Sequence, residues 1–241
     1  MMPDPWWYLP LGARLLPVIL LVPVAGGRQV PLTARLSLVI VLAGALAPAV
    51  LPAAPAPAGY RLVALLLREL GVGAVLALAA ESVLVMLQMA GQLLDDSRGA
   101  TQLRLPAAFT GDQGSALARL YLLLAMLVFF TAGGPETFLR ALLHSYRAVP
   151  LAGGVPVDTL ARVGHLALAC LATAYRGACQ VALPVVAALL LADCLLGFVN
   201  RTAPQIPVFF VGMPLKALLG VAAAALSLRG GVDAFLAAWP V

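Results

Sequence analysis

The chain has 241 residues, of which 63% are hydrophobic and 10% are charged, with a mean hydropathy of +1.02 and a formal net charge of +5. Soluble globular domains use roughly 45–50% apolar and about 25% charged residues, so this composition excludes a soluble fold and predicts an all-α membrane protein. Its basic residues are scattered singly, without aromatic interleaving, and therefore predict no nucleic-acid partner.

Apolar segments follow one another along the whole chain. Residues 51–59 are rich in proline and alanine and predict a flexible, extended linker. Residues 160–175 carry Arg162 and His165, so we expect a shorter helix there, at the membrane interface. We predict about six apolar helices in one integral membrane domain, 1–241, at Leu9–Ala25, Leu36–Ala53, Leu70–Leu94, Leu117–Thr131, Val181–Val199 and Val208–Leu228.

Glycine and proline interrupt these segments. A membrane-spanning helix needs roughly 20 residues, and several of the segments are marginal by that standard. Short, interrupted helices favour packing inside a protein complex over full exposure to lipid. Glycine pairs predict helix breaks at Gly26–Gly27, Gly133–Gly134, Gly153–Gly154 and Gly230–Gly231.

One stripe of the third segment is polar. Glu81, Gln88 and Gln92 fall close together when residues are placed about 100° apart around a helix. A carboxylate at the centre of an isolated membrane helix costs about 2.5–3.5 kcal/mol, so this stripe is expected to face protein or water. Two interpretations are open: the stripe forms interhelical hydrogen bonds that hold helices together, or it lines a conduit.

The run from Asn200 to Lys216 places an arginine, a glutamine, three prolines and the only lysine between two apolar segments. Each proline lacks an N–H and frees backbone carbonyls, and broken backbone survives in hydrocarbon only when it is buried in protein or faces water. Asp193, Gly197 and Asn200 form a small, polar face that leads into this run, and Asp193 is interpreted as a buried ion-pair partner in preference to a proton relay. We predict a helix–break–helix element inside a larger assembly.

Catalytic motifs are missing from the sequence. It has no HExxH, GxSxG or phosphate-binding loop, so we predict no enzymatic activity and no cofactor. The adjacent acids Asp95 and Asp96 point about 100° apart and are expected in the turn that ends a helix. The following loop, Thr101 to Ser115, mixes apolar residues with glycine; it is either a buried plug or a plain surface loop.

Three blocks of the sequence match a recognisable pattern: Ala90-Gly91-Gln92 with Asp96-Ser97-Arg98-Gly99-Ala100-Thr101, Phe129 to Gly134 with Ser145-Tyr146 and Pro150, and Asn200 to Lys216. Over about residues 81–228 the chain resembles the FliR/SctT/YscT/SpaR/HrcT family of type III secretion export-apparatus proteins. The wording of residues 96–101 resembles the injectisome branch, tied to virulence or symbiosis, more than the flagellar branch. One departure is Gln113 after Asp112, where family members commonly carry Asp-Pro.

The resemblance implies a structural, channel-forming subunit of the export gate, built from helical hairpins, that passes unfolded proteins across the bacterial inner membrane. It implies SctR/FliP-like and SctS/FliQ-like partners, with SctU/FlhB-like and SctV/FlhA-like components and membrane lipid beside them. It also implies that the loop 103–115 closes the conduit as a plug. The candidate plug residues are Leu103, Leu105, Pro106, Phe109, Gly111, Asp112 and Gln113.

A second set of residues is expected to serve assembly and packing. These residues are polar or are prolines that lie inside or between apolar segments. A secondary transporter, with its broken helix at 200–216, is the alternative hypothesis. The candidates are Glu81, Gln88, Gln92, Arg98, Asp193, Asn200, Arg201, Pro204, Gln205, Pro214 and Lys216.

Overall fold

A computed structural model describes residues 4–22, 30–52, 57–99, 115–153, 157–205 and 207–238. Every regular element in these ranges is helical, and four helices, or five spans if a bent pair counts as one, are long and apolar enough to cross a membrane. The prediction of an all-α membrane protein is therefore confirmed. A 3-10 turn, η1 (Pro5–Trp7), precedes α1 (Tyr8–Leu21), α2 (Leu32–Val50), α3 (Tyr60–Ser97), α4 (Ala116–Thr131), α5 (Gly134–Ala148), α6 (Val157–Thr202) and α7 (Val208–Ala238).

Glycine and proline set several helix ends. Helix α2 ends just before the predicted linker, and α3 begins after Gly59, which adopts a φ of +64° that favours glycine. Residues 53–56 of that linker lie outside the described residues. Between α4 and α5, Gly133 adopts a φ of +75°, and the two helices are bent by 76°. This confirms the predicted break at Gly133–Gly134.

Two predicted features differ from the structure because apolar pattern alone does not define a helix. The predicted helices 160–175 and 181–199 form one continuous helix, α6, since the less apolar residues between them continue the helix. Helix α5 escapes an apolar search because polar side chains, including Glu136, Arg140 and Arg147, alternate with its apolar ones.

The predicted break at Gly230–Gly231 is wrong, because α7 runs through both residues. A Cβ added at Gly231 would lie 3.1 Å from the side chain of Leu87. This glycine therefore serves close packing of α7 against α3.

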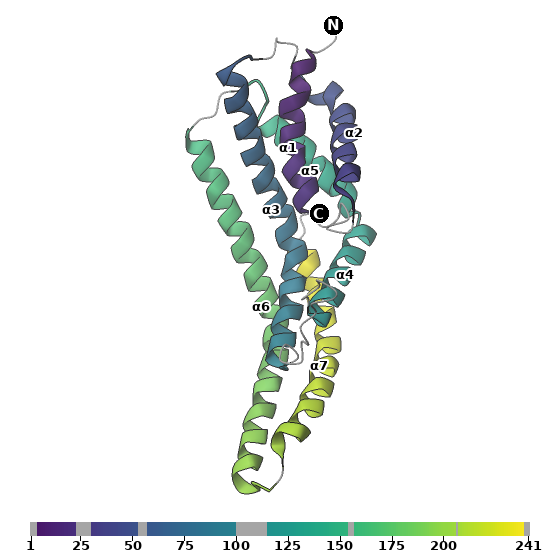
Figure 1. Cartoon of the computed structure of the whole chain (residues 1–241), viewed down its shortest axis with the longest axis vertical. Coiled ribbons are helices and arrows are strands. Elements are labelled where there is room, and N and C mark those ends of the chain that lie inside the picture. The colour runs from purple at the N-terminus through teal and green to yellow at the C-terminus, as the bar shows by residue number, and fades with distance from the viewer. Residues whose placement is uncertain are drawn as a thin grey trace. The chain divides into compact units, whose positions relative to one another are not determined.

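The chain divides into two compact units, each described by itself. Unit 1 contains residues 1–82 and 132–172, and unit 2 contains residues 83–131 and 173–241, so α3 and α6 contribute to both. In unit 1, α1 lies against α2, and α2 also contacts α5 (Figure 1). In unit 2, α4 contacts α7.

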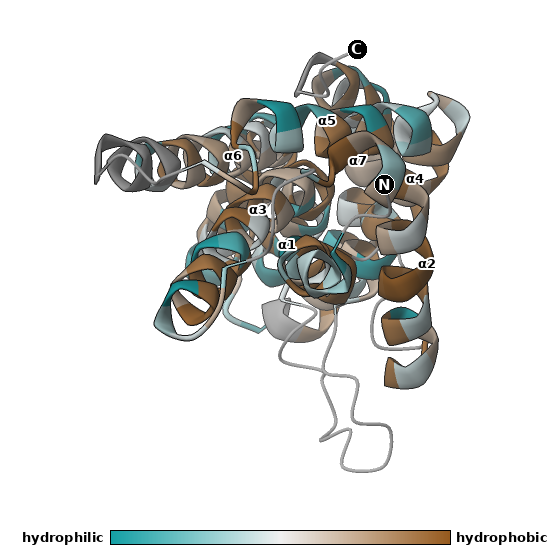
Figure 2. Cartoon of the chain, turned by 90° about the horizontal axis from the view of Figure 1, so that it is seen from above, coloured by the Kyte–Doolittle hydropathy of each residue, from teal (hydrophilic) through white to brown (hydrophobic). Residues whose placement is uncertain are grey.

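The helices carry apolar side chains on their outer faces as well as in their cores. Leu11 and Leu15 are fully buried in unit 1, and Tyr121 and Leu87 are fully buried in unit 2. Hydrophobic residues run along much of the ribbon (Figure 2). Many large hydrophobic side chains are also exposed, among them Leu226 at 82% and Ile40 at 72%. A surface of this kind is covered by lipid or by another protein.

Candidate functional site

Arg14 of α1, like Glu69 of α3, is a charged residue of unit 1 with no exposed surface. Its Nε donates to Glu69 of α3 at 2.5 Å, and its two terminal nitrogens donate to the carbonyls of Ser145 at 2.9 Å and Val149 at 2.8 Å. The guanidinium also lies over the ring of Tyr146, 4.2 Å from its centroid. Arg14 thus fastens α1 to α3 and to the end of α5.

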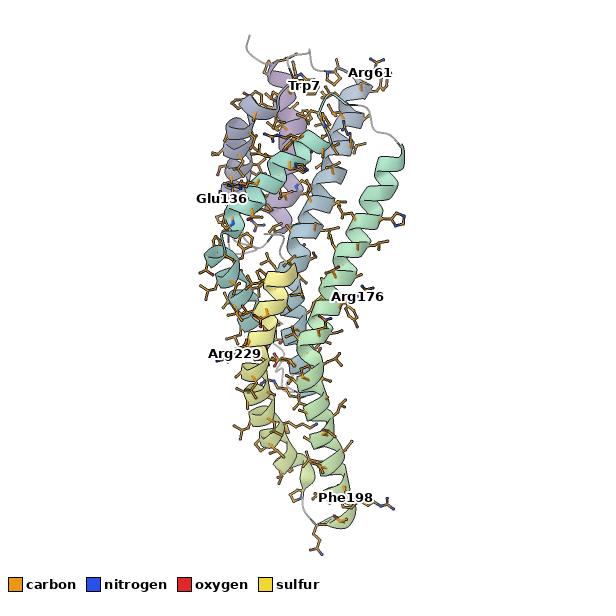
Figure 3. The ribbon with its side chains drawn as sticks, turned by 180° about the vertical axis from the view of Figure 1, so that it is seen from behind. Trp7, Arg61, Glu136, Arg176, Phe198 and Arg229 are labelled. Carbon is orange, nitrogen blue, oxygen red and sulfur yellow. The ribbon has the colours of Figure 1, made fainter. Side chains whose placement is uncertain are left out.

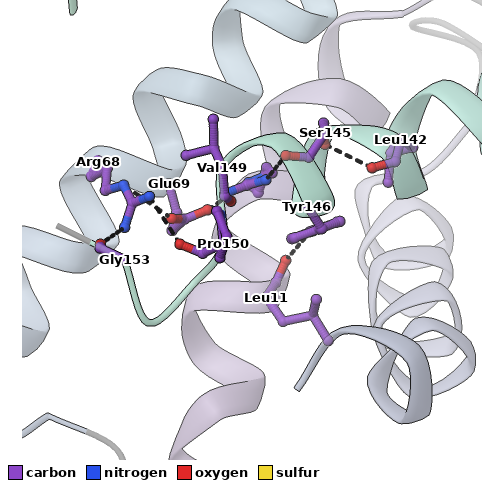
Figure 4. Close-up of polar contacts among 10 residues, drawn as sticks. Leu11, Arg68, Glu69, Leu142, Ser145, Tyr146, Val149, Pro150 and Gly153 are labelled. Carbon is purple, nitrogen blue, oxygen red and sulfur yellow. Dashed lines mark hydrogen bonds and ion pairs between the residues drawn. The ribbon is translucent and has the colours of Figure 1, made fainter. Parts of the chain in front are cut away.

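Arg68 completes this network from the neighbouring position on α3. It donates to the carbonyls of Gly153 at 2.6 Å and Pro150 at 3.0 Å, and it lies 3.6 Å from Glu69 (Figure 4). Two cations therefore hold the carbonyl-rich end of α5 and the turn that follows, where the partial negative charge of a helix favours them. The Tyr146 hydroxyl donates to the Leu11 carbonyl at 2.9 Å.

A glycine makes this contact possible. Gly73 lies one turn after Glu69 on α3, and a Cβ there would collide with the Arg14 carbonyl. The two helices therefore approach closely at Gly73, which brings Glu69 within reach of Arg14.

The charged members of this network, Arg14, Arg68 and Glu69, lie outside the residues that the sequence singles out, whereas Ser145, Tyr146 and Pro150 belong to one of its three blocks. Arginine side chains in apolar chains commonly extend to water at helix ends, whereas Arg14 is fully buried. The available signal is its place within the first apolar segment, matched by Glu69 near the start of the third.

In unit 2, Asp95 joins the end of α3 to the start of α4. Its carboxylate accepts a hydrogen bond from the Ser115 hydroxyl and one from the Leu117 N–H, at 2.9 Å, and it forms an ion pair with Arg98. Asp95 is 2% exposed, so it caps the first turn of α4 from a buried position. The sequence places Asp95 in a helix-end turn but gives no sign of this contact.

Gly91 lies one turn before Asp95 and acts as Gly73 does in unit 1. A Cβ at Gly91 would stand 2.7 Å from backbone atoms of Ala118 and Leu117. Close packing therefore explains Gly91 in the Ala90-Gly91-Gln92 block. Helix α4 crosses α3 at this glycine, and Asp95 caps the first turn of α4.

The candidate plug lies between these anchored ends. Residues 103–114, which include Leu103, Leu105, Pro106, Phe109, Gly111, Asp112 and Gln113, lie outside the described residues. On its two sides, Gly99 adopts a φ of +75° after α3, and Ser115 is bonded to Asp95 before α4.

The predicted polar stripe of α3 is half-buried. Glu81, Gln88 and Gln92 are neither fully buried nor fully exposed, and the Gln92 amide donates to Asp96 at 3.1 Å, one turn further along the same helix. Arg98 is the member of the candidate set with the clearest role here, because it pairs with Asp95 while its stem lies against Gly220 of α7.

The predicted break at 200–216 is shorter than expected. Helix α6 continues to Thr202 and α7 begins at Val208, so Pro214 and Lys216 lie inside α7. An interior proline removes one backbone hydrogen bond without ending the helix. Four other candidates are exposed on the last turn of α6 or just after it: Asn200, Arg201, Pro204 and Gln205.

Asp193 forms the expected ion pair, with Lys216 of α7 across the hairpin, but the pair is not buried as predicted. Their side chains are 40% and 24% exposed, respectively. Elsewhere in unit 2, the Tyr121 hydroxyl contacts the Ala224 carbonyl at 3.1 Å and Ser227 at 2.8 Å, a link between α4 and α7 without a signal in the sequence. Among the described residues, no three histidine, cysteine or acidic side chains gather to hold a metal ion.

Known proteins resemble this chain along most of its length. It matches the model of "Bacterial export proteins, family 1" over residues 6–239. It is 28% identical over 219 residues to the flagellar biosynthetic protein FliR of Escherichia coli (strain K12), covering 86% of this chain and 78% of that protein.

Two further relatives are named for a secretion apparatus and for the surface presentation of antigens. The secretion system apparatus protein SsaT of Salmonella typhimurium is 34% identical over 131 residues, 54% of this chain and half of SsaT. The surface presentation of antigens protein SpaR of Shigella sonnei is 31% identical over 157 residues, 65% of this chain and 59% of SpaR. Since the family match runs from residue 6 to residue 239 and the apolar helices span much of that range, this chain is a membrane-embedded member of the bacterial export proteins, family 1, the FliR/SctT family.

Proposed function

We propose that the chain is a non-enzymatic, channel-forming subunit of a type III export gate in the bacterial inner membrane, through which unfolded proteins pass. The observation that carries this proposal is the family match over residues 6–239, with relatives named for flagellar biosynthesis and for a secretion apparatus. Energy would come from partner components, because the sequence has no phosphate-binding loop.

Helix length supports a place inside a protein complex. Helix α3 has 38 residues and α6 has 46, so they are about 57 Å and about 69 Å long at 1.5 Å per residue. A bilayer core is only about 30 Å thick. Exposed leucines nevertheless continue along α6, from Leu166 to Leu195. The parts of these helices beyond the lipid therefore need a protein cover, which SctR-like and SctS-like subunits would supply.

The anchoring of the loop after α3 supports the plug. Asp95 binds Arg98 before the loop and Ser115 after it, so one buried carboxylate holds both ends of the segment that contains residues 103–114. A plug must return to one position after each substrate passes, and fixed ends favour that return.

Co-expression tests the proposal directly. We expect the chain to co-purify with SctR-like and SctS-like subunits from the same genome in one complex of defined native mass. The alternative is a secondary transporter with its broken helix at 200–216, where α6 ends at Thr202 and α7 begins at Val208. A purified chain that is stable alone and moves small solutes into liposomes would favour that alternative and overturn the export-gate proposal.

The plug has its own test. Deleting residues 105–113 should leave the complex assembled but make cells leaky to small molecules. Unchanged permeability of cells that contain the assembled complex would count against the plug.

The injectisome branch remains a prediction from residues 96–101, since relatives from flagella and from secretion systems both match. Complementation of an injectisome deletion strain and of a flagellar one, with the matching partner subunits, distinguishes the branches. Restored secretion with only the flagellar partners would contradict it.

A further inference from the structure

An acid and a glycine four residues apart occur at three places on the long helices α3 and α6. They are Glu69 with Gly73, Asp95 with Gly91, and Asp193 with Gly197. Residues four apart lie on the same face of a helix. A crossing helix can therefore approach closely at the glycine and bind the neighbouring acid.

At the first two places, a helix of the same chain packs directly against the glycine. The backbone of α1 occupies the space beside Gly73, and the backbone of α4 occupies the space beside Gly91. In both cases the acid binds the same incoming helix: Glu69 binds Arg14 of α1, and Asp95 binds the Leu117 N–H of α4. The glycine allows the helix to approach closely, and the acid forms a hydrogen bond or an ion pair with it.

The third place has the same residues but an open glycine. A Cβ added at Gly197 would meet nothing within 4 Å, and Gly197 is exposed. Helix α7 packs beside it, because Leu196 lies against Gly212, 3.0 Å from a Cβ placed there, and Lys216 pairs with Asp193. The ion pair leaves two-fifths of the Asp193 side chain exposed.

Lipid is a poor cover for this spot. Asp193 lies nine residues before the end of α6 at Thr202, and Lys216 lies eight residues after the start of α7, about 12–14 Å along each helix. The surrounding surface is apolar, with Leu190 60% exposed and Phe198, which points outward near the end of α6, 68% exposed (Figure 3). A carboxylate accepts up to about four hydrogen bonds, and an acyl chain donates none.

We infer that a helix of another membrane subunit packs across Gly197 and donates a hydrogen bond to Asp193. The inference rests on the proposed function. It adds the contact through which unit 2 binds a neighbouring export subunit. The partner helix carries a hydroxyl, amide or basic side chain at the level of Asp193, and apolar side chains above and below it to cover Leu190 and its neighbours.

A matched pair of glycine substitutions tests the inference in the co-expressed complex. Gly197→Leu fits the free chain, because its space is open, but it blocks a crossing helix. Gly164→Leu is the control, since Gly164 is exposed and open on the same helix and has no acid four residues away. We expect normal amounts of both chains in the membrane, and at least tenfold less co-purified partner for Gly197→Leu alone. Equal partner recovery from both variants would overturn the inference.

A charge exchange separates the partner's contact from the hairpin's own ion pair. Asp193→Lys with Lys216→Asp restores attraction between α6 and α7, but it presents a cation to the partner's donor. Failure of the double variant to recover partner supports the inference, and full recovery overturns it. If the unaltered chain recovers no export subunit, the proposed function fails as well; if it does and the variants match it, only this inference fails.

A photo-crosslinking residue gives a readout without disrupting the charge pair. Placed at Leu190, on the face of Asp193, it should capture a neighbouring membrane subunit. Placed at Leu195, about 140° further around α6, it should capture little protein. Equal capture at both positions, or none at Leu190 in an assembled complex, would contradict a helix seated at Gly197.

Discussion

Helices α3 and α6 both carry an acid four residues from a glycine, but the surroundings of these pairs differ. On α3, Glu69 and Asp95 are 0% and 2% exposed, and each neighbouring glycine lies against a helix of the same chain. On α6, the Asp193 side chain is 40% exposed and Gly197 has open space beside it. The α3 acids are enclosed by the fold, whereas the α6 acid stands at its surface.

The difference decides whether each charge contributes to the folding of the chain or to its assembly with other subunits. A buried carboxylate that loses its partner is left with an uncompensated charge, so the fold of the chain depends on Glu69 and Asp95. The half-exposed pair of Asp193 and Lys216 is not enclosed by the fold of the chain, so a neighbouring subunit can reach it. Substitutions on α3 should therefore alter folding first, and those on α6 should alter assembly first.

The largest effect is expected from Arg14→Leu. It leaves Glu69 buried without its closest cation and leaves the carbonyls of Ser145 and Val149 without donors, at a cost of about 3–5 kcal/mol. We expect little chain in the membrane and a much lower melting temperature for any complex recovered. Arg140→Leu is the control, since Arg140 pairs with Glu136 at an exposed site and should cost less than about 1 kcal/mol. If both variants lower the amount of chain and the melting temperature equally, the burial of Arg14 does not decide its contribution to stability.

Asp95→Ala should have the next largest effect. It removes the cap of α4 and leaves Arg98 unpaired, which we expect to cost about 2–3 kcal/mol. Asp96→Ala, at the adjacent exposed residue, should change stability by about 0.5 kcal/mol or less. The melting temperatures of the two complexes provide the measurement, and equal values would show that the buried clamp adds nothing.

Gly91→Leu should destabilise the chain itself, whereas Gly197→Leu should weaken only the binding of a partner. A side chain at Gly91 meets the backbone of Ala118 and should destabilise the complex by about 1–3 kcal/mol. Gly71→Leu is the control on the same helix, because nothing lies within 4 Å of its Cβ position. It should be neutral or stabilising by up to about 1 kcal/mol, since leucine favours a helix more than glycine does. A Gly91→Leu complex as heat-stable as the Gly71→Leu complex would show that the close crossing at α3 is dispensable.

The sequence predicts local features of this fold better than contacts between distant residues. Hydropathy defines most apolar helices, and the break at Gly133 follows from backbone freedom at one residue. The pairing of Arg14 with Glu69 joins residues 55 positions apart, and it depends on which helix faces meet. Asp193 is different: its place in an apolar helix already requires a partner, although the sequence does not decide between Lys216 and Arg201 as the cation.

The smallest effect on the chain is expected from replacing both Asp193 and Lys216 by leucine. Two leucines continue the apolar surface of α6 and α7, and replacing both members of an ion pair by apolar side chains is often neutral for stability, so the amount of chain in the membrane should stay near normal. Secretion and partner recovery should nevertheless fall, because a donor on the neighbouring helix would then face leucine. Quantifying the membrane-inserted chain and the secreted substrate in the same cells separates the two effects. Normal secretion by this variant would show that the pair serves only the hairpin, and the contrast between α3 and α6 would lose its functional meaning.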